Sequence, residues 1–199
     1  MRWAALIPLK SKGSRKSRLA PYIDGDARER LAATMFDHVA RIIAAVPRVS
    51  ETIVLAEQSP PGWSGGWIRD AGRGLNRELS AARAKLADRP VLIVHADLPL
   101  LAPEEVLALI DAAVGAGAIA PDRHGTGTNA LALPPGIAPC FAFGPASFAR
   151  HRLAMGFGAP IVRRPGLTHD LDTLDDLHCI TRALTSSPSQ TNQAIAQLG

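Results

Sequence analysis

The feature that most constrains the fold of this chain is an apolar segment, PVLIVHAD, at residues 90–97. A run of Val, Leu and Ile without polar alternation is typical of a strand that is buried on both faces of a parallel sheet. Such a sheet has to be covered by helices on both sides, because neither of its faces is polar enough to meet water. The segment therefore predicts a layered α/β fold.

The rest of the chain alternates strand-like and helix-like segments, as that fold requires. We expect strands at residues 3–9, 52–57, 67–70, 118–122, 130–134 and 159–164, in addition to 90–97. We expect helices from Asp26 to about Val46, from about Asn76, from Pro103, at 147–154 and from about Asp175. Asp26 and Glu29 have the spacing of a capping box at the start of the first helix. The pattern predicts one domain over residues 1–185 and a weakly ordered or helical tail at 186–199.

The net charge of +4 comes from one short segment rather than from the whole surface. Residues 10–18, KSKGSRKSR, hold five of the 22 basic residues and no acidic one, so 17 basic residues face 18 acidic ones elsewhere. A nucleic-acid-binding module is expected to have basic residues over much of its surface, together with exposed aromatic residues. Aromatic residues make up only 5% of this chain. We therefore expect no nucleic-acid partner.

The sequence also gives no sign of a membrane or secreted protein. No apolar run approaches the roughly 20 residues of a membrane span. The N-terminal apolar stretch is too short for a signal peptide and is not followed by a small-residue cleavage site. Two cysteines, Cys140 and Cys179, exclude a disulfide scaffold and a multi-cysteine metal site. We expect a cytoplasmic protein that does not bind membranes.

The basic segment 10–18 directly follows the first predicted strand. In α/β sheets, ligands bind beyond the carboxyl ends of the strands. Backbone amides, the flexible Gly13 and several cations at this position suit a polyphosphate. The spacing of a Walker A loop is absent. The alternative is a basic loop that is merely solvated, but its place after the strand and its lack of acidic residues favour the phosphate interpretation.

Two acidic segments supply candidate metal ligands. Asp97 follows the most apolar strand, and its carboxylate is expected at the same edge of the sheet; alternatively, it caps the next helix. Asp170 and Asp172 are two residues apart, so in an extended segment they project from one face. Like charges so placed are unfavourable unless a cation or hydrogen bonds lie between them. Carboxylate oxygens suit Mg²⁺, whereas Asp175 and Asp176 suit a helix N-terminus.

Two further segments combine glycine with hydroxyl side chains. Residues 125–131, GTGTNAL, are expected to form either a tight turn between strands or part of a binding site. Residues 143–148, FGPASF, place Ser147 at an expected helix start, where anions bind readily.

Taken in order, IPLKSKGSRKSRLAP, GLNREL, HADLPLL, GTNALAL, FGPASFARH and HDLDTLDDL resemble the 2-phospho-L-lactate guanylyltransferase family of deazaflavin coenzyme F-420 biosynthesis, over residues 4–181. The resemblance implies a Rossmann-like, GT-A-type nucleotidyltransferase fold with a mostly parallel mixed sheet and helices on both faces. It also implies transfer of GMP from GTP to a small phosphorylated three-carbon acid with release of pyrophosphate. Relatives of this type use 2-phospho-L-lactate, phosphoenolpyruvate or 3-phosphoglycerate.

The resemblance assigns a role to each candidate residue. Lys10, Lys16 and Arg18 fall where the family binds the GTP phosphates, and Asn76 lies near the nucleotide. Asp97, Asp170 and Asp172 correspond to the carboxylates that bind Mg²⁺. The resemblance implies that Lys16 and Asp97 are the catalytic residues. Thr128, Gly144 and Ser147 fall where the family holds the acid. Lys12 and Arg15 have no counterpart that we expect in the family.

The competing enzyme interpretation is a molybdenum-cofactor guanylyltransferase or a sugar-nucleotide pyrophosphorylase. Those enzymes carry a glycine-rich loop after the first strand, whereas this loop contains only Gly13. The sequence leaves open which acid is used, whether the protein forms a homodimer, and whether it hands its labile product directly to the next biosynthetic enzyme.

Overall fold

One six-stranded sheet organises the part of the chain that the computed structural model describes, which is residues 1–10, 16–86, 89–137 and 141–184. The strands lie in the order β3-β2-β1-β4-β6-β5. Their bounds are Trp3–Pro8 for β1, Val49–Ala56 for β2, Gly66–Arg69 for β3, Val91–Val94 for β4, Ala118–Pro121 for β5 and Thr128–Leu133 for β6. The central strand β4 is buried along its whole length, as its apolar sequence predicts.

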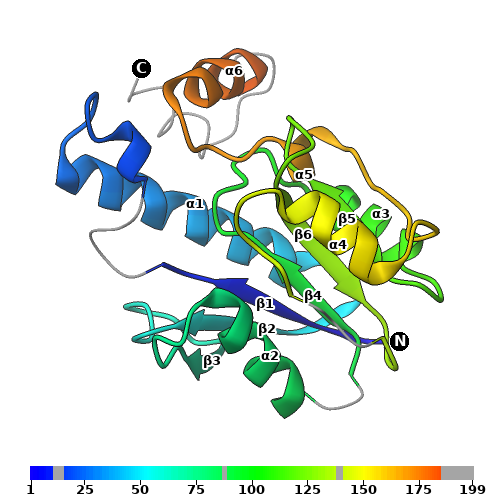
Figure 1. Cartoon of the computed structure of the whole chain (residues 1–199). Helices are drawn as coiled ribbons and strands as arrows, with labels where there is room; N and C mark the ends of the chain where they lie inside the picture. Colours follow the sequence, from blue (N-terminus) through cyan, green and yellow to red (C-terminus); the bar gives the residue numbers. More distant parts are fainter. Residues whose placement is uncertain (11–15, 87–88, 138–140, 185–199) are drawn as a thin grey trace.

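Helices cover both faces of this sheet. They are α1 (Gly25–Ala45), α2 (Leu75–Lys85), α3 (Pro103–Ala112), α4 (Ser147–Met155), α5 (Pro165–Thr168) and α6 (Leu174–Leu184), with a short 3₁₀ helix at Ser17–Leu19. Apolar residues of α1 and α3 form one core with one face of the sheet, while residues of α2 and α4 form a second core with the other face (Figure 1). Among the helices of the described residues, none is both long and apolar enough to cross a membrane.

The strand directions place the carboxyl ends of β1 and β4 next to each other. Strands β1, β2, β3 and β4 run parallel, whereas β6 is antiparallel to both of its neighbours, β4 and β5. After β1 the chain crosses through α1 on one face to β2, and after β3 it returns through α2 on the other face to β4, on the other side of β1. A crevice therefore opens between the ends of β1 and β4. Because β6 is reversed, its first residues lie at this same edge. The predicted α/β fold with a mostly parallel mixed sheet is confirmed.

A third apolar cluster attaches α6 beyond the end of the sheet, beside the N-terminal part of α1 (Figure 1). Leu177 and Ile180 of α6 pack in this cluster with Leu31 and Met35 of α1. Leu171 also belongs to the cluster and is fully buried. The cluster therefore anchors the segment that carries Asp170 and Asp172 at Leu171, between the two carboxylates, and through α6, which follows it.

Three local predictions are wrong. Residues 159–164 form no strand but a single bridge between Ile161 and Ile119, because Pro160 has no N–H to donate and Pro165 begins α5 directly afterwards. The first helix is capped by Asp24 rather than Asp26: the Asp24 carboxylate accepts a hydrogen bond from the N–H of Ala27 at 2.7 Å. Strand β4 also ends before His95, three residues earlier than expected, close to the point where its antiparallel partner β6 begins. The predicted tail at 186–199 lies outside the described residues.

The cap of α1 gives a test of this helix start. Replacing Asp24 with Ala should lower the free energy of unfolding by about 1 kcal/mol, because the N–H of Ala27 loses its acceptor. Replacing Asp26 with Ala is the control and should cost only a few tenths of a kcal/mol through the helix dipole. Urea unfolding at pH 7 measures both, and a larger cost at position 26 would contradict the observed cap.

Candidate active site

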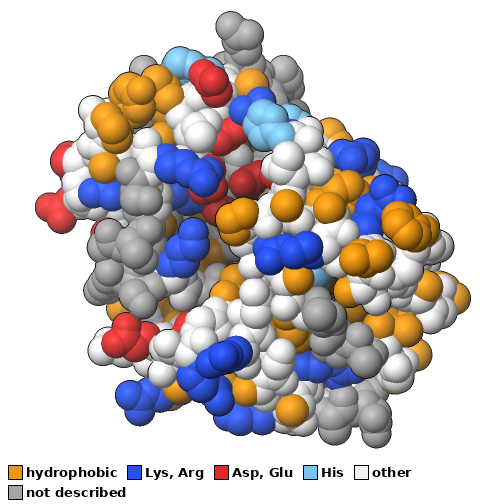
Figure 2. Space-filling view, in the orientation of Figure 1, with side chains coloured by type: hydrophobic (Ala, Val, Ile, Leu, Met, Phe, Trp, Pro, Cys, Tyr) orange, Lys and Arg blue, Asp and Glu red, His pale blue; other side chains and the backbone are white. Residues whose placement is uncertain are grey.

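A cavity of about 710 Å³ opens at the edge of the sheet where β1 and β4 end. Every predicted site residue except Asn76 lines it: Lys10, Lys16, Arg18, Asp97, Thr128, Gly144, Ser147, Asp170 and Asp172. Figure 2 shows acidic side chains gathered in a hollow of this face, with Lys and Arg side chains around it. Segments far apart in the sequence thus meet at the edge of the sheet where α/β folds bind their ligands.

A buried lysine joins two of the predicted metal ligands. The ammonium of Lys16 lies 2.6 Å from Oδ2 of Asp97 and 3.1 Å from Oδ1 of Asp172. Burial alone lowers the pKa of Lys16, but the two carboxylates outweigh it and raise the pKa above its ordinary value. The backbone of Lys16 has a φ of 53°, in the left-handed region that costs a residue with a side chain roughly 1 kcal/mol. The two ion pairs hold the residue there.

Asp97 is charged although it is deeply placed. Burial raises the pKa of its carboxyl group, but the charge of Lys16 opposes this and the net pKa is lowered. Its backbone C=O accepts the N–H of Leu171 at 3.0 Å, which places the Asp97 loop against the segment with Asp170 and Asp172. Only Oδ2 of the Asp97 carboxylate has a hydrogen-bond partner, whereas Oδ1 is buried without one. A buried carboxylate oxygen without a partner indicates a missing cation or donor.

Asp170 is held by a neutral amide instead of a cation. Nδ2 of Asn129 donates to Oδ1 of Asp170 at 3.1 Å and also contacts the carbonyl groups of Leu167 and Thr168. Burial, together with the negative charges of Asp97 and Asp172, raises the pKa of Asp170 to about 6. The site therefore concentrates more negative charge than its own cations neutralise.

The donor set suits a hard divalent cation, but the described residues do not hold three such ligands in place. No group of three His, Cys, Asp or Glu side chains in that part of the chain is arranged to bind a metal ion together. The ammonium of Lys16 lies where Asp97 and Asp172 converge, between their oxygens. The unpartnered oxygen of Asp97 and the raised pKa of Asp170 fit an added cation, and binding one between these carboxylates requires Lys16 to move.

A helix start fixes the backbone of Asp172. Oδ2 of Asp176 accepts hydrogen bonds from the backbone N–H groups of Asp172 and Thr173, and the N–H of Asp176 donates back to the hydroxyl of Thr173. This reciprocal pair is a capping box, and it places Asp176 at the helix N-terminus, as predicted. Arg123 pairs with Asp176 at 2.7 Å and ties the start of α6 to the turn before β6.

The opposite wall of the cavity consists of glycine and hydroxyl residues. Thr128 and Ser147 are each 2% exposed and come from the first residues of β6 and α4. Gly144 has a φ of 116°, which a residue with a side chain rarely adopts, and the turn that leads into α4 requires it. Asp122 shapes the neighbouring turn by accepting the N–H groups of Thr126 and Gly127, each at 2.8 Å.

Asn76 lies beside the cavity wall rather than in it. Its side-chain amide donates to the C=O of Phe143 at 3.1 Å, and its oxygen accepts the N–H of Phe143 at 2.8 Å. This paired contact places Phe143 and the following Gly144. The structure thus uses the amide of Asn76 within the protein, and a contact between Asn76 and a nucleotide stays a prediction. Lys12 and Arg15 lie outside the described residues.

Sequence reasoning missed Asp122, Asn129 and His151. A signal existed for each of them. Asn129 directly precedes the apolar strand expected at 130–134, and it marks a special position because asparagine is depleted in strands. His151 stands four residues after Ser147, on the same face of the helix. Asp122 follows a strand, as Asp97 does, and could have been considered by the same rule.

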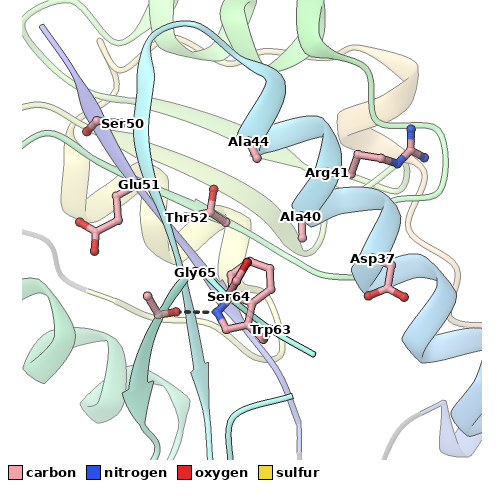
Figure 3. Close-up of a pocket in the computed structure, with 11 residues that line it drawn as sticks. Asp37, Ala40, Arg41, Ala44, Ser50, Glu51, Thr52, Trp63, Ser64 and Gly65 are labelled. Atoms are coloured by element: carbon pink, nitrogen blue, oxygen red, sulfur yellow. Dashed lines mark hydrogen bonds between the residues drawn. The ribbon is translucent and has the colours of Figure 1, made fainter. Parts of the chain in front are cut away.

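A second cavity, of about 590 Å³, lies between α1 and the segment leading into β3 (Figure 3). Its lining includes Asp37, Arg41, Glu51 and Trp63, and none of the predicted site residues. The indole N–H of Trp63 donates to the C=O of Gly66 at 2.8 Å, and its ring packs 5.4 Å from that of Phe36. Trp63 is therefore a packing residue.

Comparison with known proteins agrees with this geometry. The model of the family described as "Guanylyl transferase CofC like" matches residues 3–180. Proteins named phosphoenolpyruvate guanylyltransferase are similar: that of Sphaerobacter thermophilus is 38% identical over 186 residues, covering 87% of this chain and 89% of its own length. That of Rubrobacter xylanophilus is 36% identical over 189 residues, covering 87% and 90%.

Solved structures show the same fold at low sequence identity. A nucleotidyl transferase from Methanothermobacter has a TM-score of 0.64 at 14% identity, covering 94% of this chain and 99% of its own. A Desulfovibrio desulfuricans structure described as a nucleotide-diphospho-sugar transferase has a TM-score of 0.76 at 18% identity, covering 99% and 95%. The expected nucleotidyltransferase fold is therefore confirmed.

The raised pKa of Asp170 predicts an unusual stability profile. Its pKa is higher in the folded chain than in the unfolded one, so the folded state binds more protons between pH 4 and 6 and loses stability as pH rises through that window. Asp170→Asn should therefore stabilise the metal-free protein by about 1 to 3 kcal/mol at pH 8, with little gain at pH 4. Asp175→Asn is the matched control. Thermal unfolding at both pH values measures this, and destabilisation by Asp170→Asn at pH 8 would refute it.

Proposed function

Since this chain belongs to the family of CofC-like guanylyl transferases, we propose that it transfers GMP from GTP to the phosphate group of a small phosphorylated three-carbon acid. The observation that carries the proposal is the cavity at the ends of β1 and β4, which combines basic side chains with a cluster of carboxylates. Phosphoenolpyruvate is the acid that the names of the similar proteins favour, ahead of 2-phospho-L-lactate and 3-phosphoglycerate. The product belongs to deazaflavin coenzyme F-420 biosynthesis.

The nucleotide triphosphate binds on the side of the cavity formed by the basic residues. Lys10, Lys16 and Arg18 line this side and supply positive charge to the β- and γ-phosphates. Asp97, Asp170 and Asp172 are the residues that hold Mg²⁺, which neutralises charge on the phosphates when bound. Lys16 then leaves its position between Asp97 and Asp172 and pairs with the triphosphate instead.

The chemistry needs no protein nucleophile and no general base. The phosphate of the acid is already largely ionised at pH 7, and one of its oxygens attacks the α-phosphorus of GTP. A new P–O bond forms there, while the bond from the α-phosphorus to the bridging oxygen of the β-phosphate breaks. Pyrophosphate leaves with that electron pair. The obstacle is repulsion between two anions, and cations held by the protein lower it.

The acid binds against the wall formed by Thr128, Gly144 and Ser147. This wall offers hydroxyl groups and a turn, but none of the three side chains carries a charge that would repel an anion. The carboxylate of Asp122 is occupied by the backbone N–H groups of its own turn. A compact acid with a phosphate at one end therefore fits between this wall and the carboxylate cluster.

A product assay tests the proposal directly. With GTP and Mg²⁺, the protein should release pyrophosphate only when a phosphorylated three-carbon acid is present, and phosphoenolpyruvate should give the highest kcat/KM. Mass spectrometry of each reaction with phosphoenolpyruvate, 2-phospho-L-lactate and 3-phosphoglycerate identifies the guanylylated product. Absence of product from all three acids would remove the proposed function, whereas a preference for another acid would change only the substrate.

Two variants test the assigned roles. Asp97→Asn should lower kcat at least about tenfold, because it removes charge that holds the metal, whereas Asp37→Asn in the second cavity should leave it unchanged. Lys16→Ala should raise the KM for GTP about tenfold and that for the acid less than threefold. Lys85→Ala, an exposed charge at the end of α2, is its control. Equal effects of Lys16→Ala on both substrates would show that the basic segment is misassigned.

A further inference from the structure

His151 of α4 links β6 to the segment that leads into α4, both on the same side of the cavity, and is not part of the chemistry proposed above. It is 1% exposed, and its ring packs against that of Phe143 with 4.7 Å between the centroids. Its Nε2 lies 3.0 Å from the backbone nitrogen of Ala142, and its Nδ1 lies 2.9 Å from the hydroxyl oxygen of Thr128. Both ring nitrogens are therefore engaged.

These two contacts determine which nitrogen carries the proton. A backbone N–H can only donate, so the N–H of Ala142 requires Nε2 of His151 to be the acceptor. Burial lowers the pKa of His151 to about 4, and the ring is therefore neutral at pH 7. In a neutral imidazole the other nitrogen then carries the hydrogen, so Nδ1–H donates to the hydroxyl oxygen of Thr128.

The direction of this bond leaves the hydrogen of the Thr128 hydroxyl available. The oxygen of Thr128 accepts from His151, so its own hydrogen must point elsewhere. Within the described part of the chain, no protein group accepts that hydrogen bond, and Thr128 lines the cavity. A buried hydroxyl without an acceptor costs free energy until a ligand supplies one. Thr128 is thus prepared as a donor toward the cavity.

We propose that His151 is a positioning residue of the acid subsite, which orients Thr128 as a hydrogen-bond donor to the carboxylate of the acid. This inference rests on the proposed function. A hydroxyl that could either donate or accept would also bind a neutral donor group, whereas one committed to donation favours an anionic oxygen. His151 in this way contributes to substrate choice without touching the substrate.

The topology indicates that the carboxylate, rather than the phosphate, lies at Thr128. Successive residues of a strand point to opposite faces, so the side chains of Thr128 and Asn129 in β6 diverge. Asn129 points to Asp170 and the carboxylate cluster, where the attacking phosphate has to meet the α-phosphate of GTP. Thr128 points the other way, toward His151. The opposite end of the acid, its carboxylate, therefore reaches Thr128.

The tautomer can be measured on the unmodified protein, independently of any activity. Long-range ¹H–¹⁵N correlation spectra at pH 7 should show His151 with a protonated Nδ1 and an unprotonated Nε2. Assignment uses His151→Phe, in which this set of signals disappears. A protonated Nε2, or a doubly protonated ring, would overturn the proposal even if the enzyme is active.

Kinetics then test the link between His151 and Thr128. Thr128→Val and His151→Phe should each raise the KM for phosphoenolpyruvate about 10- to 100-fold, with the KM for GTP within twofold and kcat within about threefold. The double variant should be no worse than Thr128→Val alone, because both changes remove one interaction. Thr128→Ser, which keeps the hydroxyl, should restore most of the affinity.

Controls separate this role from a structural one and from failure of the proposed function. His178→Phe, an exposed histidine of α6, should have no effect. Additive losses in the double variant would mean that His151 acts only through packing. Isopropenyl phosphate, which lacks the carboxylate, should react equally with the unmodified protein and Thr128→Val; a tenfold loss there would place the phosphate at Thr128. If the unmodified protein guanylylates no acid, the proposed function fails, while the tautomer remains measurable.

Discussion

The rest of the site depends on the compensation of negative charge at the end of a buried sheet. Asp97 follows a strand with no exposed residue, and its carboxylate is charged there because Lys16 lies 2.6 Å away. Removing an isolated charge from water costs several kcal/mol, and the loss of one partner leaves the other uncompensated. Lys16 neutralises both Asp97 and Asp172. In the proposed function it also pairs with the triphosphate, and it cannot do both at once.

The sequence alone predicts the edge of the sheet at which the site lies, because a strand buried on both faces sends its next residue to the ligand-binding edge. Asp97 and the basic segment could be placed by this rule. The ion pairs of Lys16 could not, because they join residues 81 and 156 positions apart and depend on the packing of α6. Nor could the reversal of β6 next to β4, since its apolar sequence carries no mark of direction. The strand expected at 159–164 failed because prolines at 160 and 165 limit pairing to one residue.

Hydrogen bonds explain why motifs that are distant in the sequence occur together. Asn76 and His151 hold successive residues, Phe143 and Ala142, from the two helices that cover one face of the sheet. A change in either helix would shift Gly144 and the turn into α4. Asn76, which the family resemblance places near the nucleotide, also supports the opposite wall in the structure. Sequence patterns identify such residues but do not distinguish support from contact.

The reversed strand β6 also means that the two sides of the cavity come from different halves of the sequence. In the proposed function, the residues that face the triphosphate come before position 100, whereas the wall that faces the acid comes from the first residues of β6 and from the segment leading into α4. The carboxylate cluster draws on both halves, and Asn76 of the earlier half supports the acid-facing wall. Substitutions in the later half can therefore change the shape of the acid pocket while the nucleotide side keeps its geometry. Such an arrangement allows a lineage to exchange one acceptor for another without first losing its use of GTP.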